Sequence, residues 1–450
     1  LDAAAAVDQR LLVTSERAQA LEIQLELSRT QHIQAALQAP LDALAREFPA
    51  SRWHERALHE AGDEALVDAD LNATLEQFDR LRLAFPQSAY APGAAWQAAW
   101  AAYRLGRADA PLRLQHYLEA YPQGQEATDA LYWRGEWASA HHQPALALAC
   151  FRTTARRFPG TYFGAQARLR AVASPAASPA GVLPAWLKLF QADPPAPLAT
   201  SLPARFAPEV ARANALAQVG LAAPAATILS GVLRQQPRGA PSLRLARQLA
   251  ALDAGRGAWH QGLEAMLRAV PNYLELAPAQ LRRSDWRLLF PIPYAADIRV
   301  SAVHFGLDRS LLLGVMRQES SFNPNDLSPA RARGLMQLEL GTASGPFRHL
   351  PPAWKALAGS GPLRSSDLFN PGLNLALGAA VLQRLLQQYP EPAYALAGYN
   401  AGESRARQWQ QAYAGLETNT FIESIPFSQT RLYVQAVLRN QTHYLRIYGR

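Results

Sequence analysis

The 450-residue chain contains a single cysteine, almost no lysine and no long apolar run. One cysteine cannot form a disulfide within the chain, and it cannot supply a cysteine-based metal cluster. Cys150 lies among alanine, leucine and phenylalanine residues, so we expect it to pack as a small apolar side chain. Because no apolar stretch reaches about 18 residues, we expect no helix that spans a membrane.

Charged residues are also scarce, at 18% of the sequence, which argues against a long disordered polyelectrolyte. The net charge of +8 is carried almost wholly by arginine, which is scattered along the chain. A basic surface can attract nucleic acid, anionic lipid or an anionic wall polymer. Because no basic run is present, we expect solvated arginine side chains and no nucleic-acid partner.

The chain starts at Leu1 without a methionine or a signal-like apolar segment, which indicates a processed or trimmed product. Alanine and leucine are abundant, whereas β-branched residues are sparse. This composition favours helix over strand, and the length corresponds to roughly three domains. We therefore predict an all-α protein.

A repeat is visible in the first part of the chain. An aromatic residue followed by proline recurs at spacings of 37, 36 and 37 residues, at Phe48-Pro49, Phe85-Pro86, Tyr121-Pro122 and Phe158-Pro159. Two tryptophan pairs with i, i+4 spacing follow the same repeat, at Trp96 with Trp100 and at Trp133 with Trp137. Such a pair shares one helix face, and the proline ends one helix before the next. The pattern predicts an α-superhelical solenoid of helical hairpins over residues 1–170, a binding or spacing scaffold.

The hairpin pattern is interrupted twice further along the chain. Prolines crowd residues 171–208, where we expect loops and one short apolar helix from Ala185 to Phe190. Helical hairpins resume at about residues 209–270, and a second pair of prolines near Pro291 forbids a continuous helix there. We therefore predict a proline-rich seam with further hairpins over residues 171–290, followed by a C-terminal domain over residues 291–450.

The C-terminal domain contains a candidate acid. Asp308 can cap a helix that runs from Arg309 to about Ser320. Glu319 lies near the C-terminal end of this helix, where the helix dipole and apolar neighbours disfavour a charged carboxylate. A general acid needs such an environment to stay protonated near neutral pH. On position alone, a solvated side chain is the commoner outcome, so the neighbouring motifs decide.

Four ordered blocks follow this helix or overlap its end: Glu319-Ser320-Ser321-Phe322-Asn323-Pro324, Arg333-Gly334-Leu335-Met336-Gln337-Leu338, Ala397-Gly398-Tyr399-Asn400-Ala401-Gly402 and Phe421-Ile422-Glu423-Ser424. Together they resemble the catalytic domain of the soluble lytic transglycosylases, the large periplasmic type with a helical superhelix in front. The resemblance covers about 150 residues and implies a lysozyme-like, mainly α-helical fold with a glycan groove. It also implies cleavage of the β-1,4 bond between N-acetylmuramic acid and N-acetylglucosamine, which leaves a 1,6-anhydromuramic end.

The resemblance assigns roles to individual residues. Glu319 would be the catalytic acid and then the base, as expected where the substrate assists and one carboxylate suffices. Ser328 and Gln337 would hydrogen-bond the sugar beside the cleaved bond, whereas Met336 fits the core better than the substrate. The resemblance calls for no metal and no cofactor.

Three further substrate-binding residues come from the later blocks. Tyr399 and Asn400 end a short helix that starts at Glu391, and Tyr399 would line the groove, unless it is a core aromatic with a satisfied hydroxyl. Glu423 would lie across the groove, or it would be a structural carboxylate that bonds nearby backbone. At two positions the chain departs from the family pattern, with Glu339-Leu340 after the Gln-Leu pair and Gln429 before Thr430-Arg431.

Three functions remain open from the sequence: a lytic transglycosylase, a goose-type lysozyme-like hydrolase, and a non-catalytic wall-binding scaffold. The product end, anhydro or reducing, separates the first two. The resemblance implies a periplasmic enzyme that acts as a monomer on peptidoglycan glycan strands. Other cell-wall enzymes as partners, a lipid anchor, and cleavage at chain ends or within strands are left open.

Overall fold

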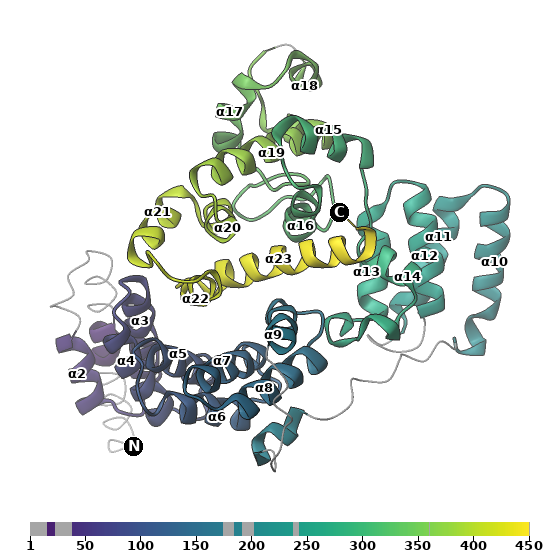
Figure 1. Cartoon of the computed structure of the whole chain (residues 1–450). Helices are drawn as coiled ribbons and strands as arrows, with labels where there is room; N and C mark the ends of the chain where they lie inside the picture. Colours follow the sequence, from purple (N-terminus) through teal and green to yellow (C-terminus); the bar gives the residue numbers. More distant parts are fainter. Residues whose placement is uncertain are drawn as a thin grey trace, which may run out of the picture. The chain divides into compact units, whose positions relative to one another are not determined.

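The computed structural model describes residues 16–22, 38–173, 184–190, 202–236, 243–359 and 361–449. Regular structure in these residues is helical (Figure 1), and their only extended pairing is two isolated β-bridges, from Arg333 to Leu327 and to Leu338. The predicted all-α class is therefore confirmed. The chain folds into two compact units: unit 1 comprises residues 1–155 and 166–192, and unit 2 comprises residues 156–165 and 193–450.

Unit 1 is a series of helical hairpins in which neighbouring helices pack on each other. The helices are α2 (Gln38–Glu47), α3 (Arg52–Val67), α4 (Leu71–Ala84), α5 (Ala91–Arg104), α6 (Ala110–Ala120), α7 (Ala127–Ala140), α8 (Pro144–Arg157) and α9 (Tyr162–Ala173), the last two of which extend to or across the unit boundary. Helices α2, α4, α6 and α8 each end immediately before one of the four aromatic-proline pairs. The predicted role of these prolines as helix terminators is confirmed.

The tryptophans of the repeat form the packing stripe that their spacing predicts. Trp96 and Trp100 of α5 are buried and stacked, with ring centroids 6.2 Å apart. Trp100 also contacts Trp133 of α7, with centroids 4.8 Å apart. Rings that fill the space between successive hairpins bury a large apolar area, so the repeat pattern and the core of unit 1 coincide.

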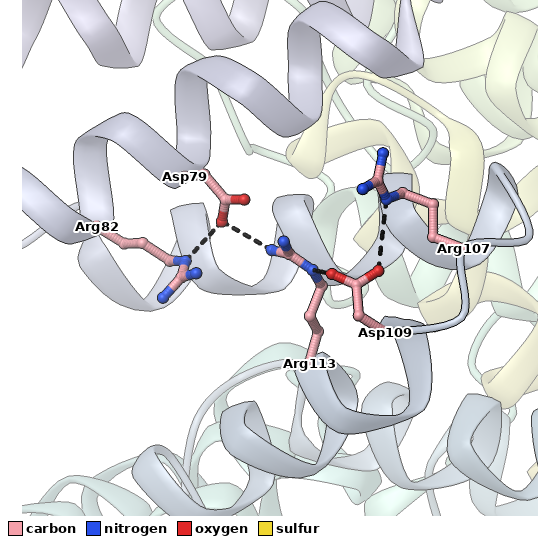
Figure 2. A network of polar contacts seen from close by, with 5 residues as sticks. All are labelled: Asp79, Arg82, Arg107, Asp109 and Arg113. Atoms are coloured by element: carbon pink, nitrogen blue, oxygen red, sulfur yellow. Dashed lines mark hydrogen bonds and ion pairs between the residues drawn. The ribbon is translucent and has the colours of Figure 1, made fainter.

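A polar network links two hairpins of unit 1 at the surface (Figure 2). Arg113 of α6 donates to Asp79 of α4 at 2.8 Å and to Asp109 at 2.7 Å, while Arg82 and Arg107 bind the same two carboxylates. The pKa of Asp109 is lowered, chiefly because Arg113 donates to it. This network is partly exposed and supports the apolar packing only modestly.

The predicted short helix in the proline-rich seam is present as the 3₁₀ helix η2 (Ala185–Phe190). It buries Trp186, Leu187 and Phe190. Most of the seam's prolines fall in residues 174–183 and 191–201, outside the described residues.

Unit 2 begins its main run with the hairpins predicted for residues 209–270. These helices are α10 (Ala207–Gln218), α11 (Ala222–Arg234), α12 (Leu243–Gly255) and α13 (Trp259–Ala269), followed by the short η4 (Tyr273–Glu275), η5 (Pro278–Gln280) and α14 (Arg283–Leu289). Helix α14 ends before Pro291 and the next helix starts at Ala295, so the predicted break is confirmed. Both sides of Pro291 belong to unit 2, and a domain boundary at this proline stays a prediction.

Residues 156–165 also belong to unit 2, although they connect α8 to α9. Gly160 N donates to Leu274 O at 2.8 Å, and the His443 ring bonds Gly160 O through Nε2 at 3.0 Å. The pKa of His443 is lowered to about 3, first by burial and then by Arg446, so its ring is neutral. Further bonds join Arg157 to Glu275 and Tyr162 to Asn419.

The remaining helices of unit 2 lie within the predicted C-terminal domain, residues 291–450 (Figure 1). They are α15 (Ala295–Phe305), α16 (Arg309–Ser320), α17 (Leu340–His349), α18 (Pro352–Lys355), η6 (Ala356–Ala358), η7 (Ser365–Phe369), α19 (Pro371–Gln388), α20 (Pro392–Ala401), α21 (Glu403–Ala412), α22 (Thr418–Ser424) and α23 (Ser428–Tyr448). The long α23 packs along α16, and α20 packs against both α19 and α23. This arrangement places α16 in the middle of the domain.

Candidate active site

Helix α16 carries the candidate acid and has the bounds that the sequence predicts. Asp308 is its N-cap, and its carboxylate accepts from Ser310 N at 2.7 Å. The helix ends at Ser320 because Ser321 adopts a left-handed conformation. Glu319 therefore lies in the last turn, where the unpaired carbonyl groups disfavour a negative charge.

Glu319 lies in a mostly protein environment with one partly exposed edge. Burial raises its pKa to about 8, and a hydrogen bond from Tyr433 acts in the opposite direction. Tyr433 Oη donates to Glu319 Oε1 at 2.6 Å, from a side chain that is 5% exposed. The carboxyl is consequently protonated near neutral pH, and because Oε1 accepts from the phenol, Oε2 is the oxygen left to carry a proton.

Tyr399 of α20 is the second phenol beside the carboxyl. The pKa of Tyr399 is raised well above its ordinary value, first by burial and then by the nearby Glu319 carboxylate. Its hydroxyl donates to Met336 O at 2.9 Å. The hydroxyl proton of Tyr399 is thus used in the bond to Met336 O. The lone pairs of the Tyr399 hydroxyl oxygen can still accept a hydrogen bond from a substrate hydroxyl.

Backbone strain is concentrated next to Glu319. Of the seven non-glycine residues with positive φ in the described chain, four fall between residues 321 and 337: Ser321, Phe322, Arg331 and Gln337. Such conformations cost of order 1 kcal/mol or more and persist where the surroundings enforce them. The surroundings therefore hold the backbone of the loop after α16 in place at several positions.

A buried asparagine of α19 holds this loop in place through hydrogen bonds to its backbone. Asn374 accepts from Met336 N at 2.7 Å and donates to Arg333 O and Leu368 O at 2.9 and 2.8 Å. Gly334 passes so close that an added Cβ would lie 2.4 Å from Leu368 O, and its φ is +75°. Glycine is therefore required there, and the loop has one defined position.

The loop is also fixed to the end of α16. Ser320 Oγ donates to Leu335 O at 2.8 Å, directly beside Glu319 in the chain. Met336 is fully buried, so the expected core position is confirmed. The sequence-based site did not include Ser320, Asn374 or Tyr433, because their contacts depend on residues distant in sequence.

Ser328 and Gln337, the two predicted sugar ligands of the loop, are both partly exposed. Ser328 Oγ accepts from Ala332 N at 3.0 Å, which leaves its own proton available. Gln337 Nε2 donates to Gly334 O and Asp326 O at 3.0 and 3.3 Å, which orients its amide. Both side chains are positioned by their own loop.

Asn400 and Glu423 differ in their exposure. Asn400 is partly exposed, and its Oδ1 accepts from Thr430 Oγ1 at 2.8 Å. Glu423 is 1% exposed and pairs with the equally buried Arg431 at 3.3 Å. A carboxylate that is buried in this way cannot contact a sugar. The geometry therefore favours the interpretation of Glu423 as a structural carboxylate over one as a substrate ligand.

Glu339, which departs from the family pattern, is exposed at the N-terminus of α17. The groups that set the pKa of Glu319 are its buried surroundings and Tyr433, and Glu339 is not among them. Among the described residues, no three histidine, cysteine or acidic side chains gather as metal ligands. No helix in the described ranges has the length and apolar character to cross a membrane.

The part of the chain that carries this site is similar in sequence to known proteins. Residues 298–422 match the Transglycosylase SLT domain, and residues 51–173 match a family described as an outer membrane lipoprotein. The soluble lytic murein transglycosylase of Salmonella typhimurium is 37% identical over 145 residues, which are 32% of this chain and 21% of that protein. The Escherichia coli K12 protein of the same name is 35% identical over 162 residues, 36% of this chain and 24% of its own length.

Solved structures extend the similarity of fold to the whole chain. An inactive mutant of the lytic transglycosylase Slt from Pseudomonas aeruginosa gives a TM-score of 0.66 at 22% identity, covering 99% of this chain and 72% of that one. The 70 kDa soluble lytic transglycosylase from Escherichia coli gives a TM-score of 0.55 at 19% identity, with 98% and 73% covered. The fold is thus a helical superhelix followed by a lysozyme-like domain, as predicted.

Fold and site together combine a lysozyme-like helical domain with a carboxyl, that of Glu319, whose pKa is raised by burial. Residues 298–422 match the Transglycosylase SLT domain, and the chain is similar in sequence to soluble lytic murein transglycosylases. Its matched stretch spans a fifth to a quarter of the length of these curated relatives.

Proposed function

We propose that this protein is a peptidoglycan lytic transglycosylase that leaves 1,6-anhydromuramic ends. The observation that carries the proposal is the carboxyl of Glu319, whose pKa is raised to about 8 with one oxygen bound to Tyr433. A glycosidase that lacks a second carboxylate depends on its substrate for assistance. N-acetylmuramic acid provides that assistance through its acetamido group.

In the first step, the Glu319 Oε2 proton passes to the glycosidic oxygen that leaves with N-acetylglucosamine. The bond from C1 of muramic acid to that oxygen breaks, and the acetamido oxygen stabilises the positive charge at C1. Glu319 becomes a carboxylate, and the 2.6 Å hydrogen bond from Tyr433 stabilises the new charge. One residue has then acted as general acid.

In the second step, the Glu319 carboxylate takes the proton of the muramic 6-hydroxyl. The freed O6 attacks C1 and closes the 1,6-anhydro ring, and the acetamido group returns to its initial state. Glu319 ends protonated, as it began, so no water is consumed. A pKa of about 8 suits a group that must both give and take a proton near neutral pH.

Substrate contacts are assigned to partly exposed groups around the carboxyl. Ser328, Gln337 and Asn400 would hydrogen-bond the sugars, and Tyr399 would accept from a muramoyl hydroxyl with its remaining lone pairs. Glu423 would act through Arg431, which lies in the first turn of α23. The protein would act in the periplasm as a monomer on glycan strands, and the hairpins of unit 1 would serve as a scaffold for an extended partner.

The test is mass spectrometry of peptidoglycan digested with the purified protein, with Glu319→Gln as the matched variant. We expect 1,6-anhydromuropeptides from the wild type and a loss of at least about a hundredfold in the variant, the usual worth of a general acid. Reducing-end products would instead indicate a lysozyme-type hydrolase. The absence of products from both proteins would favour a wall-binding scaffold.

A further inference from the structure

Arg331 also has a strained backbone in this loop, but no contact of its side chain explains why the backbone keeps this conformation. Phe322 is buried, and the Gln337 amide binds two loop carbonyls, so both side chains contribute to holding the backbone. Arg331 has φ +65° and an exposed side chain. Glycine would adopt this conformation without steric cost, so a long charged side chain here calls for another reason.

The turn that carries Arg331 is well defined. Arg331 N donates to Ser328 O at 2.9 Å, and the backbones of Ser328 and Ala332 bond each other at 3.0 Å, with the Ser328 hydroxyl on Ala332 N. The turn thus fixes the start of the Arg331 side chain three residues from Ser328, a proposed sugar ligand. Extended chain spans at most about 3.6 Å per residue, so the two Cα atoms lie within roughly 11 Å.

The same turn concentrates positive charge. Arg333 Nη1 donates to Arg331 O at 2.5 Å, which brings a second guanidinium to the turn. Asp326 is the one carboxylate of residues 326–338, and within the described chain it forms no ion pair with either arginine. An exposed guanidinium with no carboxylate of its own is suited to bind a carboxylate from the substrate.

We infer that Arg331 is a specificity-determining residue that binds a carboxylate of the peptides attached to muramic acid. The inference rests on the proposed function, because it requires a glycan strand bound beside Glu319. It gives a reason for an arginine at a position where glycine would adopt the positive φ with a lower conformational energy. It also predicts that the protein prefers peptide-bearing strands to naked glycan.

The test compares peptide-bearing peptidoglycan with glycan stripped of peptides by an amidase. We expect Arg331→Asn and Arg331→Gly, which both tolerate positive φ, to lower kcat/KM on peptide-bearing strands about tenfold, the size of one charge-assisted hydrogen bond. Arg331→Lys keeps the charge and should lose about threefold or less. Activity on stripped glycan should stay unchanged in all three.

Two controls make the outcome decisive. Arg299→Gln removes an exposed arginine of α15 and should change neither activity. The melting temperature of Arg331→Gly should equal or exceed that of the wild type, since strain is relieved. Equal losses on both substrates, or no loss on either, would overturn the role of Arg331 alone, whereas a wild type that yields no anhydro products would overturn the proposed function and this inference together.

Discussion

At the scale of single residues, Glu319 and its two phenols form a compact proton site. Burial raises the pKa of the carboxyl, and Tyr433 partly offsets this by donating to it. Tyr399 contacts the backbone of Met336, so the two tyrosines differ in what they bind. This difference lets their roles be separated by experiment.

The raised pKa of Glu319 couples protein stability to pH. Because the pKa is 4.5 in an ordinary glutamate and about 8 here, the folded state holds one more proton than the unfolded state between these values. Stability should therefore fall as pH rises through this window, by at most about 1.4 kcal/mol per unit. Glu319→Gln lacks this dependence on pH. The melting temperature of the variant minus that of the wild type should therefore increase from pH 5 to pH 8. Parallel curves for the two proteins would contradict the raised pKa.

Removal of the Tyr433 hydroxyl should move the pH profile. The hydrogen bond lowers the pKa of Glu319, so Tyr433→Phe should shift the alkaline limb of kcat/KM to higher pH. Loss of orientation should also reduce kcat, by about tenfold. Tyr399→Phe is the matched control and should leave the limb in place. An unshifted limb in Tyr433→Phe would show that this bond does not set the acid's pKa.

At the scale of elements, the loop after α16 depends on a few buried polar bonds. Asn374 satisfies three backbone groups of Arg333, Met336 and Leu368 at once. Asn374→Ala should destabilise the protein by about 3 kcal/mol or more, since each buried group left unpaired costs about 1–3 kcal/mol. Chemical unfolding would measure this. Gln387→Ala, at an exposed position of the same helix, should stay within about 0.5 kcal/mol.

Local signals explain which elements could be predicted from the sequence. The Asp308 cap and the left-handed end at Ser321 define α16 with contacts only a few residues apart, and the aromatic-proline pairs end helices in the same way. The Tyr433 bond to Glu319 joins residues 114 apart in sequence. A pattern in one sequence carries no distance between such residues. The motifs include both Glu319 and Tyr433, but they did not indicate that the phenol binds the acid.

At the scale of the whole molecule, residues 156–165 are the least expected feature. The repeat assigns Phe158-Pro159 to the hairpin series, yet this stretch belongs to unit 2. No local sequence pattern predicts that residues 156–165 belong to unit 2, because this assignment depends on bonds of Gly160 to the distant residues Leu274 and His443. Periodicity therefore predicts the helices and not the unit to which each segment belongs.

Gly160→Ala tests this assignment. An added Cβ would lie 2.7 Å from Leu274 O and 2.8 Å from Leu274 Cα. We expect a loss of about 1–3 kcal/mol in thermal unfolding, because backbone must move to make room. Gly93→Ala in α5 is the control, because a Cβ added at Gly93 would meet no heavy atom of a neighbouring residue within 4 Å. We expect this variant to gain about 0.5–1 kcal/mol of stability. Similar effects at both positions would contradict the close packing of residues 156–165 in unit 2.

The membership of residues 156–165 has a consequence for how the protein can be taken apart. The backbone passes between the two units three times, after residues 155, 165 and 192. A single proteolytic nick therefore releases neither unit whole. A chimera joined only after residue 192 takes residues 156–165 of unit 2 from the wrong parent. The two units are interleaved along the sequence, so the exchange of either unit as a whole needs more than one junction.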